Sequence, residues 1–263
     1  MTNSRKKHQE KILSQFTSQA KRFDQKGYSL SNKEYLAWTL ENIPLNKDMV
    51  VLDAAAGTGI LARKLAGAVR KVYALDATAS MLAAGEKLAG EAGLENVIFK
   101  QGLAEALPYP DQKFDLVTCR LAFHHFYDYK TPFLEMLRVT KKGGFLVVMD
   151  LISPAAEKIA ARYNELETLR DDSHIYALTE KEFIDLFENH GLQPAKVLNR
   201  DVEMVTEDWL NLTKASKSAR ETIFRALEGE LKNGEKTGMR PFKKEGALHF
   251  LHRWILVLAQ KPA

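Results

Sequence analysis

Short apolar runs alternate with segments of helical hydrophobic spacing through the middle of the chain. The apolar runs predict strands, and helices are expected after Gly59, Thr78 and Thr131. This alternation is typical of a doubly wound α/β sheet. The tail 248–258 is apolar and β-prone, so it predicts one further strand. The strands expected before the tail are residues 49–53, 71–76, 96–100, 114–119 and 144–150.

Helical patterns also precede and interrupt the expected sheet. Apolar residues recur at helical spacing from Ile12 to Phe23, and residues 31–34 form a capping box for a second helix that ends before Pro44. Two long segments, after the fifth strand and before the last one, carry further helical patterns. We therefore expect an N-terminal helical cap at 1–47 and a main domain at 48–263, with lid insertions at about 151–178 and 203–246.

Capping residues mark two later helix starts. Thr131 can cap a helix with its hydroxyl, and the following Pro132 is preset for a first helical turn. Thr179 and Glu182 have the spacing of a capping box, and the helix that they open is expected to end at Gly191.

The composition is that of a soluble protein of ordinary size. With 263 residues, of which 45% are hydrophobic, the chain can bury a full core. The net charge of +4 is small and dispersed, which does not favour nucleic acid. Apolar stretches are too short for a membrane span, and the single Cys119 fits a reducing compartment. We expect a cytoplasmic protein without membrane insertion, and the oligomeric state is left open.

A small-residue loop joins the first strand to its helix. It runs from Asp53 to Gly59 and contains Gly57, so the backbone can turn sharply and approach a ligand closely. The second strand ends at Asp76. Because the carboxyl ends of neighbouring parallel strands share one crevice, we expect Asp76 to lie beside the loop, where it suits a ribose diol.

Two cofactor classes fit this arrangement. Gly57, Gly59 and Ala62 match the dinucleotide pattern G-x-G-x-x-A, and Asp76 follows at the usual distance. Asp53, however, would repel a pyrophosphate and attract a cation. S-adenosylmethionine carries an ammonium, a sulfonium and an adenosine but no phosphate. The two acids therefore favour S-adenosylmethionine, and NAD(P) remains the alternative.

Five motifs in order resemble the class I S-adenosylmethionine-dependent methyltransferases, and within them the ubiquinone and menaquinone biosynthesis branch with its small-molecule relatives. The likeness covers roughly residues 48–152 and is looser beyond. The motifs are Val51–Gly59, Ala74–Asp76, Gly102–Tyr109, Phe114–Arg120 running into Phe123–Phe126, and Val139–Gly144.

This resemblance implies a seven-stranded Rossmann-like sheet in the order 3-2-1-4-5-7-6 with the last strand antiparallel. It also implies cofactor contacts from Asp53, Ala55, Gly57, Gly59, Asp76, Ala77, Met81, Gly102, Leu103, Ala104 and Arg120. Two positions depart from the family pattern. Ala55 stands where glycine is usual, and Leu103 stands where an aspartate commonly accepts from the adenine amino group, so backbone groups or water would have to serve.

The fourth strand leads into Phe123-His124-His125-Phe126 at the edge where the crevice is expected. Methyl transfer needs positioning and the removal of a proton from the acceptor, and a histidine suits that second task. His125, and next to it His124, are candidates for a base or a substrate-orienting group. The alternative is one structural histidine and one that faces the cofactor without titrating. No ligand motif accompanies the pair, so no metal is expected.

The polar cluster 170–174 is either a solvated loop or part of the acceptor site. In the resembling family this segment folds over the acceptor, so Arg170 and His174 are expected to face the same pocket as His125 and to orient an anionic or phenolic acceptor. The sequence thus predicts methyl transfer to a small organic acceptor, with aromatic or quinone-like molecules as first candidates. The alternatives are an NAD(P)-dependent oxidoreductase, an RNA or protein methyltransferase, and a non-catalytic cofactor-binding module.

Overall fold

The computed structural model describes residues 3–20, 23 and 32–263. In this part of the chain an eight-stranded sheet has the order β3-β2-β1-β4-β5-β8-β6, and β7 pairs with β8 beside it. The strands are β1 Val50–Ala54, β2 Lys71–Asp76, β3 Val97–Gln101, β4 Phe114–Arg120, β5 Thr140–Ile152, β6 Pro194–Val205, β7 Phe242–Lys244 and β8 Ala247–Gln260.

The sheet confirms the expected fold and strand order. The first five strands in this order, β3, β2, β1, β4 and β5, pair in parallel. Strand β8 is antiparallel to β5 on one side and to β6 on the other. Strand β6 was implied by the resemblance but not located in the sequence. Its segment carries several charges, and Val202 is its only buried residue, because it is an edge strand with little contact to the core. The extra β7 completes a hairpin with β8.

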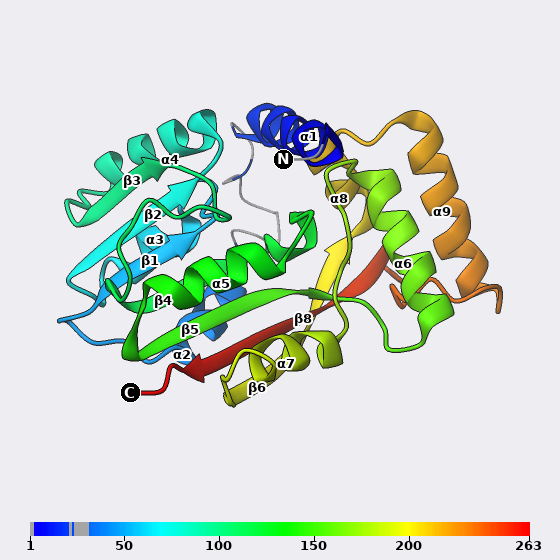
Figure 1. Cartoon of the computed structure of the whole chain (residues 1–263). Coiled ribbons are helices and arrows are strands. Elements are labelled where there is room, and N and C mark those ends of the chain that lie inside the picture. The colour runs from blue at the N-terminus through cyan, green and yellow to red at the C-terminus, as the bar shows by residue number, and fades with distance from the viewer. Residues whose placement is uncertain (1–2, 21–22, 24–31) are drawn as a thin grey trace.

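Helices cover both faces of the sheet. Helices α5 and α7 lie in front of it in Figure 1, α2 and α3 lie behind it, and α1 lies across the top between α4 and α8. Helices α6, α8 and α9 pack together at the far ends of β5 and β8. The bounds are α1 Asn3–Gln19, α2 Lys33–Glu41, α3 Ile60–Leu65, α4 Ala79–Glu91, α5 Lys130–Val139, α6 Glu157–Arg170, α7 Glu180–Glu188, α8 Thr206–Thr213 and α9 Lys217–Leu231.

The helix ends correct part of the capping analysis. The capping box at Thr179 is present and opens α7. Thr131 does not cap α5: its hydroxyl donates to Asp128, whose other oxygen accepts from the Lys130 N–H. The helix begins at Lys130, two residues before the expected start at Pro132. Helix α2 is capped by Asn32, and the predicted cap Ser31 lies outside the described residues.

The last turn of the N-terminal helix pattern is also shorter than expected. Helix α1 ends at Gln19, and Phe23, which the helical spacing included, lies beyond its end. The backbone N–H of Phe23 still donates to the carbonyl of Gln19. Phe23 therefore stays close to the end of α1, where its ring contacts the glycine loop after β1.

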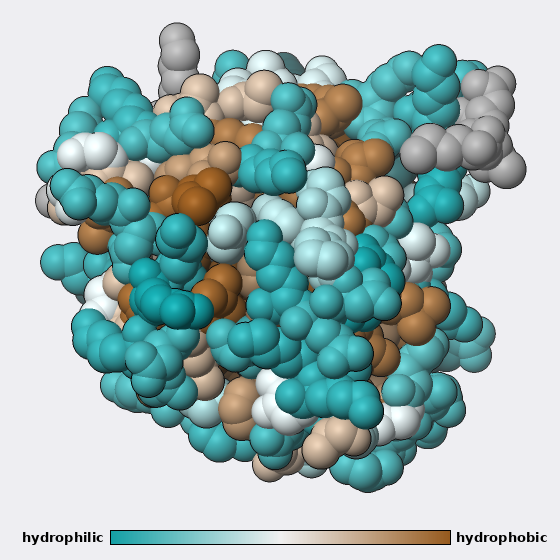
Figure 2. Space-filling model, turned by 60° about the vertical axis from the view of Figure 1, so that its left-hand side comes forward, coloured by the Kyte–Doolittle hydropathy of each residue, from teal (hydrophilic) through white to brown (hydrophobic). Residues whose placement is uncertain are grey.

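The outer surface is mainly hydrophilic on the side that carries α4 and β3. Figure 2 brings this side forward and shows hydrophobic residues there in separate patches between hydrophilic ones. Among the described helices, none combines the length and the apolar character that crossing a membrane requires.

Two glycines of α4 offer a matched test of its packing on the glycine loop. A Cβ at Gly85 would lie 2.3 Å from the carbonyl oxygen of Thr58 and 2.5 Å from the Phe99 ring, whereas a Cβ at Gly90 would meet nothing within 4 Å. We expect Gly85→Ala to lower the free energy of unfolding by about 1–3 kcal/mol through overpacking. Gly90→Ala should raise it by up to about 1 kcal/mol. Denaturant titration measures both, and equal effects would contradict this packing.

Candidate functional site

The carboxyl ends of β1, β2 and β4 border a cavity that we call the first cavity. It encloses about 970 Å³ of empty space that opens to solvent, and α1 forms its opposite wall. Of the predicted cofactor residues, Gly59 and Met81 do not line this cavity. Those that do are Asp53, Ala55, Gly57, Asp76, Ala77, Gly102, Leu103, Ala104 and Arg120.

The loop after β1 is shaped by residues with positive φ. Gly57 has φ +57° and Ala55 has φ +53°, so alanine stands here in a conformation that favours glycine. Gly59 also has a positive φ, but a Cβ on it would lie 2.8 Å from the Phe99 ring. Gly59 is therefore required by packing inside the domain, while Gly57 faces the cavity.

Asp76 is held against this loop. One carboxylate oxygen accepts the Gly57 N–H at 2.8 Å, and the other accepts the Thr78 N–H at 2.8 Å. Burial raises the pKa of Asp76, and these two backbone hydrogen bonds oppose that shift. The carboxylate lines the first cavity beside the loop, as the strand order predicted.

Asp53 lies deeper in the same cavity. Its oxygens accept from the Thr118 hydroxyl at 3.0 Å and from the Ala62 N–H at 3.2 Å. Burial raises its pKa to about 7, against the lowering effects of the Thr118 hydrogen bond and the Arg120 charge. Burial lowers the pKa of Arg120 to about 10, and the charges of Asp53 and Asp150 oppose that shift. Arg120 thus bears a positive charge between two buried acids.

A second cavity lies beside the first and encloses about 810 Å³ of empty space. Its walls come from α1, α6, α8, β6 and β8, and from the short 3₁₀ turn η2, Phe123–His125. The two cavities share a wall of Phe16, Phe23, Leu121 and His125. Leu121 has φ +55°, a strained conformation for a bulky side chain, and strain of this kind clusters at functional sites.

The two histidines of η2 have opposite electrostatic environments. Nδ1 of His124 lies 2.5 Å from the buried carboxylate of Asp150. Burial alone lowers the pKa of His124, but the charge and hydrogen bond of Asp150 outweigh it and raise the pKa. Burial and the neighbouring His124 charge hold the pKa of His125 well below its usual value. The surroundings of His124 therefore favour its charged form, and those of His125 favour its neutral form.

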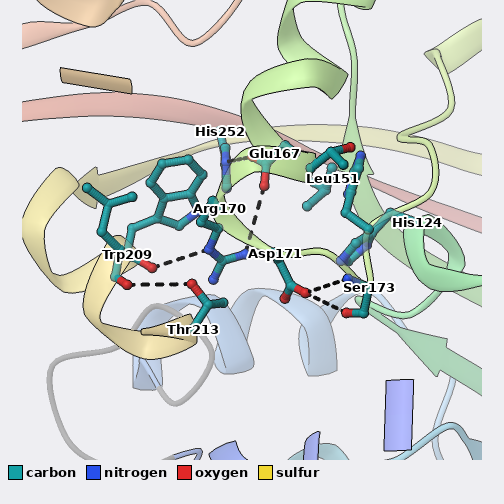
Figure 3. Close-up of polar contacts among 12 residues, drawn as sticks. His124, Leu151, Glu167, Arg170, Asp171, Ser173, Trp209, Thr213 and His252 are labelled. Carbon is teal, nitrogen blue, oxygen red and sulfur yellow. Dashed lines mark hydrogen bonds and ion pairs between the residues drawn. The ribbon is translucent and has the colours of Figure 1, made fainter. Parts of the chain in front are cut away.

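Arg170 lines the second cavity together with His124 and His125, as expected. Figure 3 shows its guanidinium between the α8 backbone and Glu167. Nε donates to the Trp209 carbonyl at 3.2 Å, and Nη1 lies 3.8 Å from Glu167, whose other oxygen is 2.7 Å from Nε2 of His252. Burial raises the pKa of Glu167, but His252 and Arg170 outweigh it and lower the pKa to about 2.

His174 is not brought to the cavity, which corrects the expectation that it faces the same pocket as His125. It is buried, its Nε2 is bonded to the side chain of Asn164 at 2.9 Å, and burial lowers its pKa to about 4. The solvated-loop alternative for this segment is also wrong, because Asp171 and Ser173 are buried and only Asp172 is exposed. The sequence pattern predicted no role for Asp171 or Ser173 within this cluster.

Two further residues of the site were missed. His252 is buried and lines the second cavity. Asp150 is fully buried near the carboxyl end of β5. It is the last residue of the strand expected at 144–150, as Asp53 and Asp76 are of the first two expected strands. An acid near the end of a predicted parallel strand was the available signal for Asp150. No pattern in the sequence placed His252 beside Glu167, which lies 85 positions away.

Helix α1 holds the shared wall in place. Nε2 of His8 lies 2.8 Å from the carbonyl oxygen of His125, and the Phe16 ring packs edge-on against the His125 ring at 5.0 Å between centroids. Among the residues that the structure describes, no three His, Cys, Asp or Glu side chains converge as metal ligands. That no metal is used stays a prediction.

Comparisons with known proteins point to one family. Residues 52–148 match the family model described as a methyltransferase domain. Over 160 residues the chain is 34% identical to the "Uncharacterized methyltransferase YcgJ" of Bacillus subtilis, covering 61% of this chain and 63% of that one. Over 211 residues it is 30% identical to the ubiquinone/menaquinone biosynthesis C-methyltransferase UbiE of Escherichia coli O1:K1, covering 75% and 84%. The chain belongs to the S-adenosylmethionine-dependent methyltransferase family.

A solved structure extends the likeness. The crystal structure of the Bacillus subtilis YcgJ protein superimposes with a TM-score of 0.78 at 27% identity, covering 88% of this chain and all of that one. The aligned sequence spans just under two thirds of the YcgJ relative. Membership in this family argues against the alternative of an NAD(P)-dependent oxidoreductase.

The first cavity fits the family cofactor. Asp76 places a carboxylate beside the loop, where a ribose diol could donate to it, and Asp53 places a buried acid where a cation could pair with it. Leu103 and Ala104 supply apolar surface for a base, and the Leu103 carbonyl is already bonded to the Ala106 N–H. The donor set therefore suits a positively charged nucleoside derivative without phosphate.

Asp76 is the first residue to test. Asp76→Ala is expected to weaken S-adenosylmethionine binding by about 1.5–3 kcal/mol, the range for hydrogen bonds to a charged group. Isothermal titration calorimetry measures this directly, and far-ultraviolet circular dichroism checks that the variant is folded. Wild-type affinity in the folded variant would remove Asp76 from the ribose position.

Asp53 predicts a pH dependence of binding. Because its pKa is about 7 in the cofactor-free protein, Asp53 is largely protonated below pH 7 and must lose that proton to pair with a cation. The affinity for S-adenosylmethionine should rise with pH up to about 7 to 8 and fall by up to about tenfold per pH unit below it. Calorimetry from pH 6 to 8 measures this slope, which Asp53→Asn should abolish.

The same shift predicts how stability changes without the cofactor. The folded pKa of Asp53 lies above the unfolded value of 3.8, so its contribution favours folding at low pH and is lost as the pH rises from about 4 to about 7. Asp53→Asn should remove this contribution. A binding slope that persists in Asp53→Asn would assign the proton to another group.

Proposed function

We propose that the chain binds S-adenosylmethionine in the first cavity and methylates a small organic acceptor held in the second. The observation that carries this proposal is the shared wall. Two cavities of similar size meet at Phe16, Phe23, Leu121 and His125, so a donor and an acceptor can approach each other only there. When bound, S-adenosylmethionine supplies an electrophilic methyl group with a good leaving group.

His125 is proposed as the base of the reaction. It lines both cavities, it favours the neutral form, and in the described part of the chain its Nε2 has no hydrogen-bond partner. A neutral imidazole nitrogen at the border of the cavities can take the proton that an acceptor loses on methylation. The surroundings of His124 and His125 push their pKa values in opposite directions. Such a pair supports different roles for the two residues, with His125 as the base and His124 as its charged neighbour.

His124 contributes a fixed charge rather than a proton. Its ring centroid is 4.1 Å from that of His125, and its cation is compensated by Asp150. A cation at this place stabilises negative charge that develops on an acceptor as its proton leaves. It also keeps His125 neutral before the reaction.

The second cavity supports an aromatic or quinone-like acceptor. Trp209, Trp254 and Phe16 supply flat apolar walls. The indole N–H groups of both tryptophans and the side-chain amide of Gln19 are buried without a hydrogen-bond partner in the described structure. A buried donor without a partner is costly, and carbonyl or phenol oxygens of a ligand would satisfy such groups.

Arg170 is proposed to orient the acceptor. Its guanidinium has five N–H donors, and the contacts to the Trp209 carbonyl and Glu167 use only part of them. Glu167 compensates part of the positive charge, so a phenolic or neutral oxygen suits this position better than a full anion. A small-molecule acceptor, a cytoplasmic location and the absence of a nucleic-acid partner stay predictions of the sequence.

A labelled-donor assay tests the proposed function. Incubation of the protein with methyl-labelled S-adenosylmethionine and a metabolite extract should yield a labelled small molecule. His125→Ala should lower turnover at least about 100-fold, since a positioned base contributes a factor of this size, while cofactor affinity changes little. His190→Ala is the matched control, because His190 lies outside both cavities.

Two outcomes would contradict the proposal. Full turnover in His125→Ala would remove the base from this position. Label in RNA or protein, with none in small molecules, would replace the proposed acceptor class.

A further inference from the structure

A buried chain of three side chains leads away from the proposed base. Ser173 Oγ lies 3.1 Å from Nδ1 of His125 and 2.6 Å from the carboxylate of Asp171. We propose that Asp171, acting through Ser173, is a positioning residue that keeps His125 in the tautomer with a bare Nε2 facing the cavities. This inference rests on the proposed function for its chemical meaning, but the tautomer itself is measurable without any acceptor.

The backbone of Ser173 identifies the tautomer. Nδ1 of His125 lies 3.1 Å from the Ser173 carbonyl oxygen, and a carbonyl oxygen only accepts. Nδ1 must therefore carry the proton. In neutral imidazole the second nitrogen is then an unprotonated acceptor, so Nε2 is free to act as a base.

The hydroxyl of Ser173 is the group that could undo this arrangement. A hydroxyl both donates and accepts, so on its own it could turn its proton toward Nδ1 and favour the opposite tautomer. Asp171 prevents this, because its carboxylate only accepts and the Ser173 hydroxyl donates its hydrogen bond to it at 2.6 Å. The Ser173 oxygen then presents lone pairs to His125.

Asp171 is itself held rigidly. The same carboxylate oxygen accepts the Ser173 N–H at 3.0 Å, and the Asp171 N–H donates to Glu167 in the last turn of α6. The His174 N–H donates to the Asp171 carbonyl. Asp171 and Ser173 are 3% and 0% exposed, so water does not compete for these bonds.

Charged neighbours make the position of Asp171 significant. His124 on the same turn disfavours a proton on His125, and so does His174 on the next segment at a pH low enough to protonate it. Nε2 of His8 in α1 contacts the carbonyl of His125. Asp171 is the neighbouring acid that favours the protonated form. It therefore stabilises the imidazolium that forms once Nε2 has taken a proton from the acceptor. Both protons then remain on the His125 ring, and none passes to Asp171.

Histidine tautomers can be read by long-range ¹H–¹⁵N NMR on protein labelled at its seven histidines, assigned with His125→Asn. Wild type should show His125 as the Nδ1–H form near pH 7.5. Asp171→Ala removes the acceptor of the Ser173 hydroxyl, so a measurable share of the Nε2–H form should appear. Asp172→Ala is the matched control, because this neighbouring side chain is exposed and pairs with Lys11, and it should leave the signal unchanged.

A double variant distinguishes positioning from simple structural support. In Asp171→Ala/Ser173→Ala the misdirected hydroxyl is gone and the carbonyl of residue 173 still faces Nδ1, so the Nδ1–H form should return. Loss of structure would not be rescued by a second substitution. Turnover should fall at least tenfold in Asp171→Ala and recover in part in the double variant.

Each result separates the two ideas. An unchanged His125 signal in Asp171→Ala, or no return of the Nδ1–H form in the double variant, overturns the positioning role. If the tautomers change as expected but His125→Ala retains full turnover, the positioning role stands and the proposed base is wrong.

Discussion

The buried carboxylate of Asp150 is the group on which the geometry of the site depends. It is fully buried, and its oxygens accept from the Phe123 N–H at 2.6 Å, the Leu151 N–H at 2.7 Å and Nδ1 of His124 at 2.5 Å. A buried charge is tolerated only when it is paired and hydrogen-bonded, and these three contacts satisfy that requirement. They also tie the turn η2 to strand β5, which sets the direction of both histidines.

From Asp150 a row of alternating charges crosses the carboxyl edge of the sheet. The row runs from Asp53, which lines the first cavity, through Arg120 and Asp150 to His124, which lines the second cavity. Strand register makes this possible, because Asp53 lies opposite Thr118 on β4 and Arg120 lies opposite Met149 on β5. A cation that enters the first cavity therefore lies at one end of a row of ionisable groups that continues through Arg120 and Asp150 to His124. The two cavities are joined by charge as well as by their shared wall.

Helix α1 completes both cavities from a distant part of the sequence. His8 and Phe16 contact His125 across more than a hundred positions, and Phe23 covers the glycine loop. The cap expected at residues 1–47 thus supplies side chains to the shared wall. Segment 151–178 supplies Arg170 and Asp171, and segment 203–246 supplies Trp209. The walls of the second cavity come mainly from segments outside the matched methyltransferase domain.

The sequence by itself determined the parallel sheet, the glycine loop and the acids at the carboxyl ends of β1 and β2, because these depend on short-range signals. An apolar run, a turn with glycine and an acid at a strand end all lie within a few residues of one another, and the right-handed crossover rule brings neighbouring strand ends together. The tertiary structure alone decided the edge strand β6, the burial of Asp171 and Ser173, the pairing of His252 with Glu167 and the exclusion of His174 from the cavity. These outcomes depend on contacts between residues far apart in the chain, where burial changes hydrogen bonding and charge, and no local pattern records which distant side chain will arrive.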